Sequence, residues 1–275
     1  MNYNEIQPNM VLRAYARTQL NGAWGGMAFT YFLYFLLFIP SDIFSFLDKV
    51  LNSDNFADLY LQISVQNFMD RNLPDLVPLI PAIDNILLIA VLITAGPFAL
   101  GFAGFFLKRL RGEQIAVKDI FNGFKRFVPS FLLMFFTMLF YSLWCLLLII
   151  PGIIKLFSYS MAFYIMYDNP EMKPLEALKK SQIMMKGYKG KYFFLLLSFI
   201  GWIFITALPF ALGVNWLKMQ LAARPLAMGF LWLYPYINLS IANFYENLKR
   251  NQENTRTENQ TANPEKPPVD FFQAT

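Results

Sequence analysis

The 275-residue sequence contains no histidine and a single cysteine, Cys145. The lack of histidine removes the commonest general base and the commonest zinc ligand. One cysteine cannot form a disulfide within the chain, which excludes a disulfide-stapled secreted fold. Paired carboxylates, a nucleophile elbow, a phosphate-binding loop and a metal-ligand cluster are also missing. No catalytic residue, cofactor site or metal site is therefore predicted, and the chain is not expected to be an enzyme.

Charge is scarce as well, at 15% of residues, whereas hydrophobic residues make up 56%. The apolar residues form blocks long enough to cross a bilayer rather than short stripes, which predicts an all-α integral membrane protein. The net charge of +5 does not indicate nucleic acid, because the basic residues fall at the ends of apolar blocks, where membrane topology explains them.

Six apolar stretches predict a six-helix transmembrane bundle that occupies residues 1–246. The predicted spans are 22–39, 86–107, 128–150, 153–167, 192–216 and 226–245. The stretch 153–167 is short for a span, so topology decides whether it crosses. The first stretch is interpreted as an uncleaved signal anchor because no small-x-small cleavage site follows it.

Basic residues cluster between the second and third spans and again before residue 192, and the positive-inside rule places both clusters in the cytoplasm. This requires 128–167 to cross twice, with Pro151-Gly152 as the hairpin. Lys155 is then expected to extend its ammonium outward. The loop 41–81 is rich in aspartate and is predicted to be external and partly helical. Both termini are predicted to be cytoplasmic, and the polar tail 247–275 is predicted to be disordered.

Two amphipathic connectors, around 117–124 and 177–188, are predicted to lie flat on the cytoplasmic membrane surface. The first places Val117, Ile120, Phe121 and Phe124 on one face with Asp119 opposite, and the apolar face of the second includes Ala177 and Ser181. The connectors either form part of a true internal repeat or simply look alike as basic loops. The candidate contacts for anionic lipid are Lys108, Arg109, Arg111, Lys118, Lys179, Lys180 and Lys186.

No Asp, Glu, Lys or Arg lies in the interior of a predicted span, which disfavours an ion-coupled pump. What remains is uncharged polarity and helix breaks. The candidate positions are Thr94, Gly96, Pro97, Tyr236, Asn238 and Asn243. A break at Gly96-Pro97 is compatible with a substrate site, but close helix packing is the more common reason for such residues.

Several short motifs resemble the bacterial integral-membrane family called domain of unknown function 975. The strings are Gly96-Pro97 with Gly101, 119–124 (DIFNGF), 148–154 (LIIPGII), 159–163 (YSMAF), 168–170 (DNP), 177–181 (ALKKS), 185–187 (MKG) and 197–202 (LSFIGW), with Pro235-Tyr236 and Phe244-Tyr245. Tyr188 stands where the family often has histidine. The resemblance implies a multi-pass protein of the bacterial inner membrane and no established activity.

Three hypotheses for function follow. The first is a non-enzymatic envelope scaffold that binds anionic lipid headgroups, membrane protein partners or further copies of itself. The second is a permease or channel for a small uncharged or amphiphilic solute. The third is an accessory subunit of a lipid-modifying enzyme.

Overall fold

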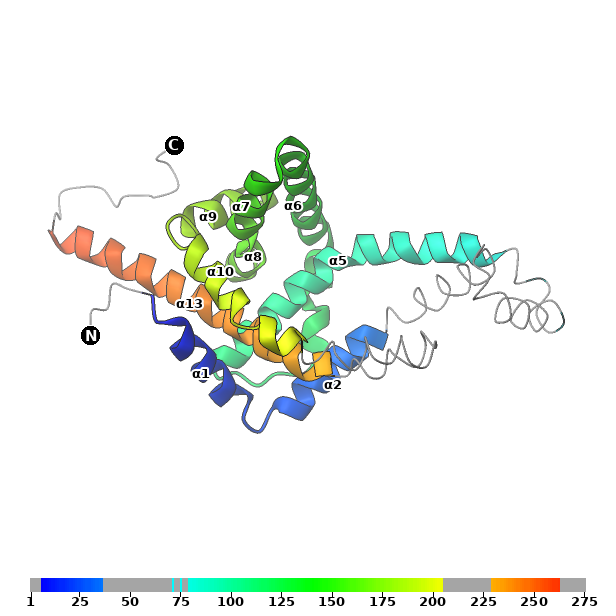
Figure 1. The fold of residues 1–275 in the computed structure, drawn as a ribbon, viewed down its shortest axis with the longest axis horizontal. Coiled ribbons are helices and arrows are strands. Elements are labelled where there is room, and N and C mark those ends of the chain that lie inside the picture. The colour runs from blue at the N-terminus through cyan, green and yellow to red at the C-terminus, as the bar shows by residue number, and fades with distance from the viewer. Residues whose placement is uncertain (1–5, 37–70, 72–74, 76–78, 205–228, 263–275) are drawn as a thin grey trace. The chain divides into compact units, whose positions relative to one another are not determined.

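The computed structural model describes residues 6–36, 71, 75, 79–204 and 229–262, and every regular element in these ranges is a helix (Figure 1). The chain divides into two compact units, one of Met1–Phe29 with Gly96–Thr275 and the other of Thr30–Ala95. Two helices, α2 (Trp24–Leu36) and α5 (Ile80–Leu110), run from one unit into the other. The all-α prediction is therefore confirmed for the described residues.

Three helical stretches among the described residues are long and apolar enough to cross a membrane: Asn85–Leu110, Val117–Leu147 and Ile150–Asp168. They fall on the predicted spans 86–107, 128–150 and 153–167. The predicted spans 22–39, 192–216 and 226–245 lie partly outside the described residues, so the count of six stays a prediction. The predicted external loop 41–81 lies almost wholly outside them, and α5 begins at its end, at Ile80.

The two halves of α5 differ in burial. In the smaller unit, Ile86 is 64% exposed and Leu92 is 61% exposed, whereas Phe106 and Leu107 in the larger unit are buried. Large apolar side chains exposed in a row along a helix are unfavourable in water. The first half of α5 therefore has the surface of a helix surrounded by lipid.

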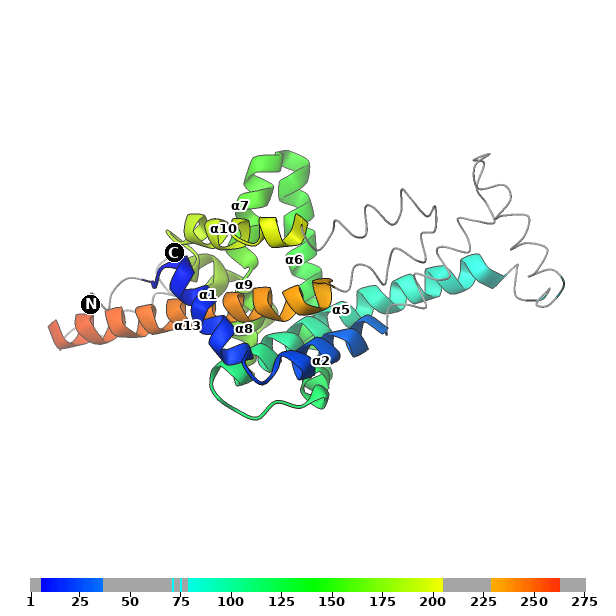
Figure 2. The ribbon, with the colours of Figure 1, turned by 60° about the horizontal axis from the view of Figure 1, so that its bottom comes forward.

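A hairpin of α6 (Phe127–Leu147) and α7 (Ile149–Tyr159) projects from the larger unit (Figures 1 and 2). The chain reverses at Leu148, which is extended, so the prediction of a turn at Pro151-Gly152 is wrong. Pro151 lies instead in the first turn of α7, where a missing N–H breaks no helical hydrogen bond. The tip is apolar, and Leu146 is 88% exposed.

The second arm of the hairpin is interrupted. α7 ends at Tyr159 and α8 (Ala162–Asp168) begins after a turn at Ser160, so the predicted span 153–167 is two helices rather than one. At the break, the Ser181 hydroxyl donates to the Ser158 carbonyl at 2.7 Å and accepts from the Met161 N–H at 3.2 Å. Ser181 thus satisfies two backbone groups that the interruption releases.

Ser181 belongs to α9 (Pro174–Met184), which corresponds to the second predicted connector. The predicted apolar face is correct, because Ala177, Leu178, Ser181 and Met184 are buried. However, α9 packs against α6, α7 and α8, so the prediction that this face sinks into the membrane surface is wrong. The reason is that the broken hairpin offers α9 a protein surface with backbone groups to satisfy.

The first connector, η2 (Val117–Arg126), is a 3-10 helix. Because a 3-10 helix has three residues per turn, Ile120 and Gly123 share its buried face, and Phe121 lies 45% exposed on another. Asp119, predicted on the polar face, is buried and accepts hydrogen bonds from Lys108 and the Ala116 N–H. The predicted division of faces, based on an α-helical period, is wrong for these residues.

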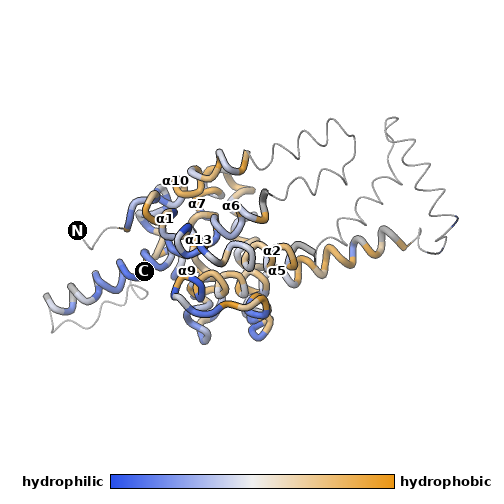
Figure 3. Tube along the Cα trace, turned by 90° about the horizontal axis from the view of Figure 1, so that it is seen from below, coloured by the Kyte–Doolittle hydropathy of each residue, from blue (hydrophilic) through white to orange (hydrophobic). Residues whose placement is uncertain are grey.

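Helices α1 (Asn9–Leu20) and α13 (Gly229–Ala262) pack against each other in the larger unit. Leu12, Ala16 and Leu20 form the buried stripe of α1. α13 continues through a hydrophilic stretch to Ala262 (Figure 3), so the prediction of disorder from residue 247 is wrong for 247–262. No proline or glycine interrupts this stretch, and Leu248 is buried. Residues 263–275 lie outside the described part of the chain. Finally, α10 (Lys189–Leu197) packs on α1 and α7.

Candidate functional site

Two separate clusters of charged and aromatic side chains lie along α13, and each contains one tyrosine of this helix. The first lies where α5 and α8 end, because Arg111 directly follows α5 and Asp168 is the last residue of α8. Gly112, with φ of +78°, reverses the chain after Arg111. α13 contributes Tyr245 and, one helical turn apart, Glu246 and Lys249.

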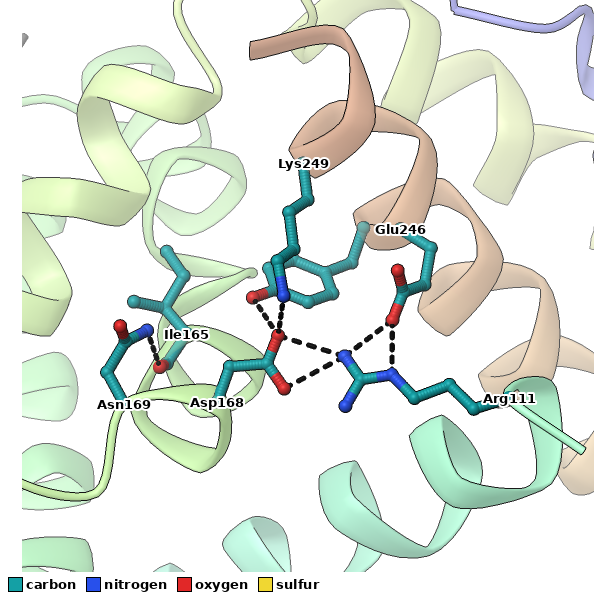
Figure 4. A network of polar contacts seen from close by, with 7 residues as sticks. Arg111, Ile165, Asp168, Asn169, Glu246 and Lys249 are labelled. Atoms are coloured by element: carbon teal, nitrogen blue, oxygen red, sulfur yellow. Dashed lines mark hydrogen bonds and ion pairs between the residues drawn. The ribbon is translucent and has the colours of Figure 1, made fainter. Parts of the chain in front are cut away.

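Asp168 is the centre of this first cluster, which we call the Asp168 network (Figure 4). Arg111 Nη2 lies 2.9 Å from both carboxylate oxygens of Asp168, and Arg111 Nε donates to Glu246 Oε1 at 2.8 Å. Lys249 Nζ donates to Asp168 Oδ2 at 2.7 Å, and the Tyr245 hydroxyl donates to the same oxygen at 3.0 Å. One guanidinium thus joins the ends of α5 and α8 to the middle of α13.

The Asp168 network is balanced in charge, with two cations and two carboxylates. The Asp168 side chain is only 7% exposed, so its charge depends on these partners. Burial has the largest influence on the Arg111 pKa and lowers it, but the hydrogen bonds to Asp168 and Glu246 outweigh burial and raise the pKa overall. This arrangement leaves no uncompensated charge for a ligand and has the character of a structural joint.

The second cluster, which we call the Arg13–Arg17 cluster, lies between α1 and α13. Arg13 Nε and Arg17 Nε donate to the same oxygen, the Tyr236 hydroxyl, at 3.2 and 2.9 Å. The two arginines are one helical turn apart on α1, so both reach the same face of α13. No carboxylate pairs with either of them among the described residues, in contrast to Arg111.

Aromatic rings surround the two guanidinium groups. The Arg13 guanidinium carbon lies 5.1 Å from the centre of the Phe199 ring, and that of Arg17 lies 5.3 Å from the centre of the Tyr236 ring. Trp24 lies beside Tyr236 and Trp232, with ring centres 6.5 and 6.2 Å apart. Cation–π contacts stabilise the arginines but supply no negative charge. The cluster therefore keeps its two positive charges.

Lys155 is placed differently from the prediction. Its ammonium does not extend outward but lies 4.8 Å from the centre of the Trp144 ring on α6 and 3.3 Å from Gln182 Oε1 on α9. Burial, followed by the positive charge of Lys155, lowers the pKa of Lys189. The two lysines are therefore close enough to repel each other.

Of the predicted helix-break positions, Gly96 and Pro97 lie where helices pack closely. A Cβ on Gly96 would collide with the Ser130 carbonyl, and one on Gly101 would collide with the Ile120 carbonyl. Close backbone packing of α5 on α6 and η2 thus explains why glycine is needed at both positions, as the packing interpretation of Gly96-Pro97 proposed. Pro97 takes part in the same contact, because a Cβ on Gly123 would collide with its carbonyl.

The remaining polar candidates bond to backbone or to α1. Thr94 and Asn238 donate to the carbonyls of Ala90 and Tyr234, four residues earlier in their own helices. Asn243 is buried and donates across to the Leu12 carbonyl of α1 at 3.1 Å. Together with Tyr236, Asn243 fastens α13 to α1.

The predicted lipid contacts also divide into two groups. Lys108 pairs with Asp119 at 3.0 Å, Arg109 donates to the Gln19 carbonyl at 2.8 Å, and Arg111 belongs to the Asp168 network. These three act inside the protein. Of the other four, Lys118, Lys179 and Lys186 are exposed and Lys180 is half-buried.

Asp168 and Tyr245 were noted only within the motifs of the family resemblance, and Glu246, Lys249, Arg13 and Arg17 were not predicted as site residues. The spacing of Leu12, Ala16 and Leu20 indicates that residues 9–20 form a helix, which would have placed both arginines on one face. Among the described residues, no group of three or more histidine, cysteine, aspartate or glutamate side chains is placed to hold a metal ion.

The fold defines an all-helical protein with membrane-length apolar helices. A family model described as "Protein of unknown function (DUF975)" matches residues 145–252. The match confirms the resemblance to this family over that range, which includes Asp168, Tyr236 and Tyr245 but neither Arg13, Arg17 nor Arg111. No curated protein and no solved structure matches the chain.

Proposed function

We propose that this protein is a non-enzymatic membrane scaffold of the bacterial inner membrane that binds anionic lipid through exposed lysines at the base of the α6–α7 hairpin. The observation that carries the proposal is on η2, where the exposed ring of Phe121 lies in the same short helix as the exposed Lys118 and Lys125. An aromatic ring beside lysines suits the membrane surface, because the ring enters the headgroup region and the ammoniums attract anionic lipid.

A contact at the base of the hairpin supports placing both connectors, η2 and α9, on the same side of the membrane. Arg126, at the end of η2, donates to the Met166 carbonyl near the end of α8 at 2.9 Å. The chain thus returns from the tip at Leu148 to the place where it left. This supports a topology in which η2 and α9 belong to the same side, the cytoplasmic one under the positive-inside rule, with both termini there as well.

A permease is not favoured by the described contacts. Gly96 is in backbone contact with α6, so this break holds helices together rather than opening between them. The scaffold is accordingly the single function proposed, with partners limited to anionic lipid, other membrane proteins or further copies of this chain.

The test measures lipid selectivity of the full chain in vesicles of mixed anionic and zwitterionic phospholipid, by spin resonance of spin-labelled phosphatidylglycerol and phosphatidylcholine. Each lysine near the surface contributes about 1 kcal/mol of attraction. Lys118→Gln with Lys125→Gln is therefore expected to lower the preference for the anionic lipid at least about twofold, less at high salt.

The matched control removes the same charge elsewhere. Arg250→Gln with Arg256→Gln changes two exposed residues in the hydrophilic part of α13 and should leave the preference unchanged. Equal selectivity of the wild-type chain and the η2 double variant would contradict the proposal.

A further inference from the structure

The Arg13–Arg17 cluster has an excess of positive charge that no carboxylate among the described residues neutralises. Both Nε atoms donate to the Tyr236 hydroxyl, so the two guanidinium groups are held close together against their repulsion. Neither guanidinium has a carboxylate partner, and neither has a further hydrogen-bond acceptor for its Nη groups among the described residues. Two adjacent, uncompensated arginines are a common arrangement for binding an anion.

The shared hydroxyl adds a further donor. Since the Tyr236 oxygen accepts from both arginines, its own hydrogen is directed elsewhere, and no acceptor for it lies among the described residues. Tyr236 itself is 6% exposed, so its position is fixed by packing. The cluster therefore offers several N–H groups and one O–H group around a single point, which suits an anion with several oxygens.

The cluster is accessible from one side. Arg17 is exposed and Arg13 half-buried, whereas Leu12, Ala16 and Leu20 on the other face of α1 are buried. Trp232 is 53% exposed and lies beside Trp24 next to the arginines. Tryptophan and tyrosine are typical of the headgroup level of a membrane, where an apolar ring meets a polar surface.

We propose that Arg13 and Arg17, with the Tyr236 hydroxyl between them, bind the phosphate group of an anionic amphiphile whose acyl chains pass along Trp24 and Trp232. Guanidinium groups match phosphate geometry through paired hydrogen bonds, and a phosphate provides enough oxygens for two of them. The inference deepens the proposed function, on which it rests, by giving anionic lipid a discrete site. Its residues differ from those of η2, so the two proposals can fail separately.

The experiment uses the full chain in a neutral detergent and follows tryptophan fluorescence during titration with phosphatidic acid that carries brominated acyl chains. Bromine quenches nearby indole rings, so binding beside Trp24 and Trp232 gives a saturable signal. Brominated diacylglycerol tests the chains without the phosphate, and inorganic phosphate, added as a competitor, tests the anion without the chains.

Phosphatidic acid should half-saturate the signal at a concentration about tenfold lower than diacylglycerol, the factor that corresponds to one good charge-assisted contact. Arg17→Gln should weaken binding of phosphatidic acid about fivefold or more, whereas Arg17→Lys, which keeps the charge but not the forked geometry, should lie between it and the wild type. The matched control Arg250→Gln removes another exposed arginine of the same charge and should leave the titration unchanged. Trp24→Phe with Trp232→Phe should remove the saturable component.

Three outcomes would overturn the inference. The first is an unchanged titration in Arg17→Gln together with a lower thermal midpoint, because the arginine would then serve only to fasten α1 to α13. The second is displacement by inorganic phosphate at concentrations equal to that of the lipid, which would indicate a site for the free anion. The third is equal binding of phosphatidic acid and diacylglycerol. If selectivity at η2 fails but these titrations behave as expected, the discrete site stands without the wider scaffold surface.

Discussion

The two clusters on α13 have similar components, but the Asp168 network is balanced in charge and the Arg13–Arg17 cluster has an excess of positive charge. Tyr245 donates its hydroxyl to Asp168, and Arg111 and Lys249 are matched by Asp168 and Glu246. Tyr236, nine positions earlier, accepts from Arg13 and Arg17, and no carboxylate balances them among the described residues. Because isolated charge is unfavourable in a partly buried place, the balanced cluster serves the fold, and the uncompensated charge of the other is the reason we propose an anion site there.

The strongest test of the comparison is Asp168→Asn. It leaves the side chain the same size but leaves Arg111 and Lys249 without their shared counter-charge. Removing one partner of a buried ion pair costs several kcal/mol. Because the Arg111 side chain is 31% exposed, we expect a smaller loss, about 2–3 kcal/mol in the free energy of unfolding. The measurement is a denaturant titration in mixed micelles.

Glu253→Gln, at an exposed position further along α13, provides the control and should change the free energy of unfolding by less than about 0.5 kcal/mol. If Asp168→Asn proved as mild as this control, the Asp168 network would not be a structural joint. Its balanced charge would then not distinguish it in function from the Arg13–Arg17 cluster.

A paired substitution compares the two kinds of arginine directly. Arg111→Gln removes a guanidinium that holds two carboxylates and should lower the free energy of unfolding by about 1–2 kcal/mol. Arg17→Gln removes one of two like charges and should change it by less than about 0.5 kcal/mol in the absence of added lipid. The same micelle titration measures both. Equal losses would show that Arg17 is as structural as Arg111, against the interpretation of its cluster as a ligand site.

Local pattern was sufficient to predict where the three membrane-length apolar helical stretches lie and which face of α9 is buried, because helical period and the length of an apolar stretch depend on neighbouring residues. The predicted face of η2 failed because a 3-10 helix, with three residues per turn, moves Phe121 away from Ile120. The turn at Leu148 was missed because proline in a first turn of a helix resembles proline in a loop.

The candidate site could be predicted only in part, for a different reason. Asp168 lies 57 positions and Glu246 lies 135 positions along the chain from Arg111, so no local pattern brings the three together. Tyr236 was identified as a polar group in an apolar stretch, but its partners are more than 200 positions away. Charge balance depends on tertiary contacts, and the sequence alone could count the charges without pairing them.

The smallest expected effect on stability comes from adding a carboxylate to the Arg13–Arg17 cluster, which makes its charge more like that of the Asp168 network. Ala14 is exposed on α1, three residues before Arg17, so Ala14→Glu places a carboxylate next to the guanidinium. Such a pair on a helix surface stabilises by about 0.3 kcal/mol, which a denaturant titration in mixed micelles would register as a slight gain. The same carboxylate should compete with a bound phosphate and weaken phosphatidic acid binding about threefold or more, whereas the neutral Ala14→Gln should change neither quantity. Undiminished binding in Ala14→Glu would mean that the positive charge of the cluster is not what attracts the lipid. The contrast between Tyr236 and Tyr245 would then have no functional meaning.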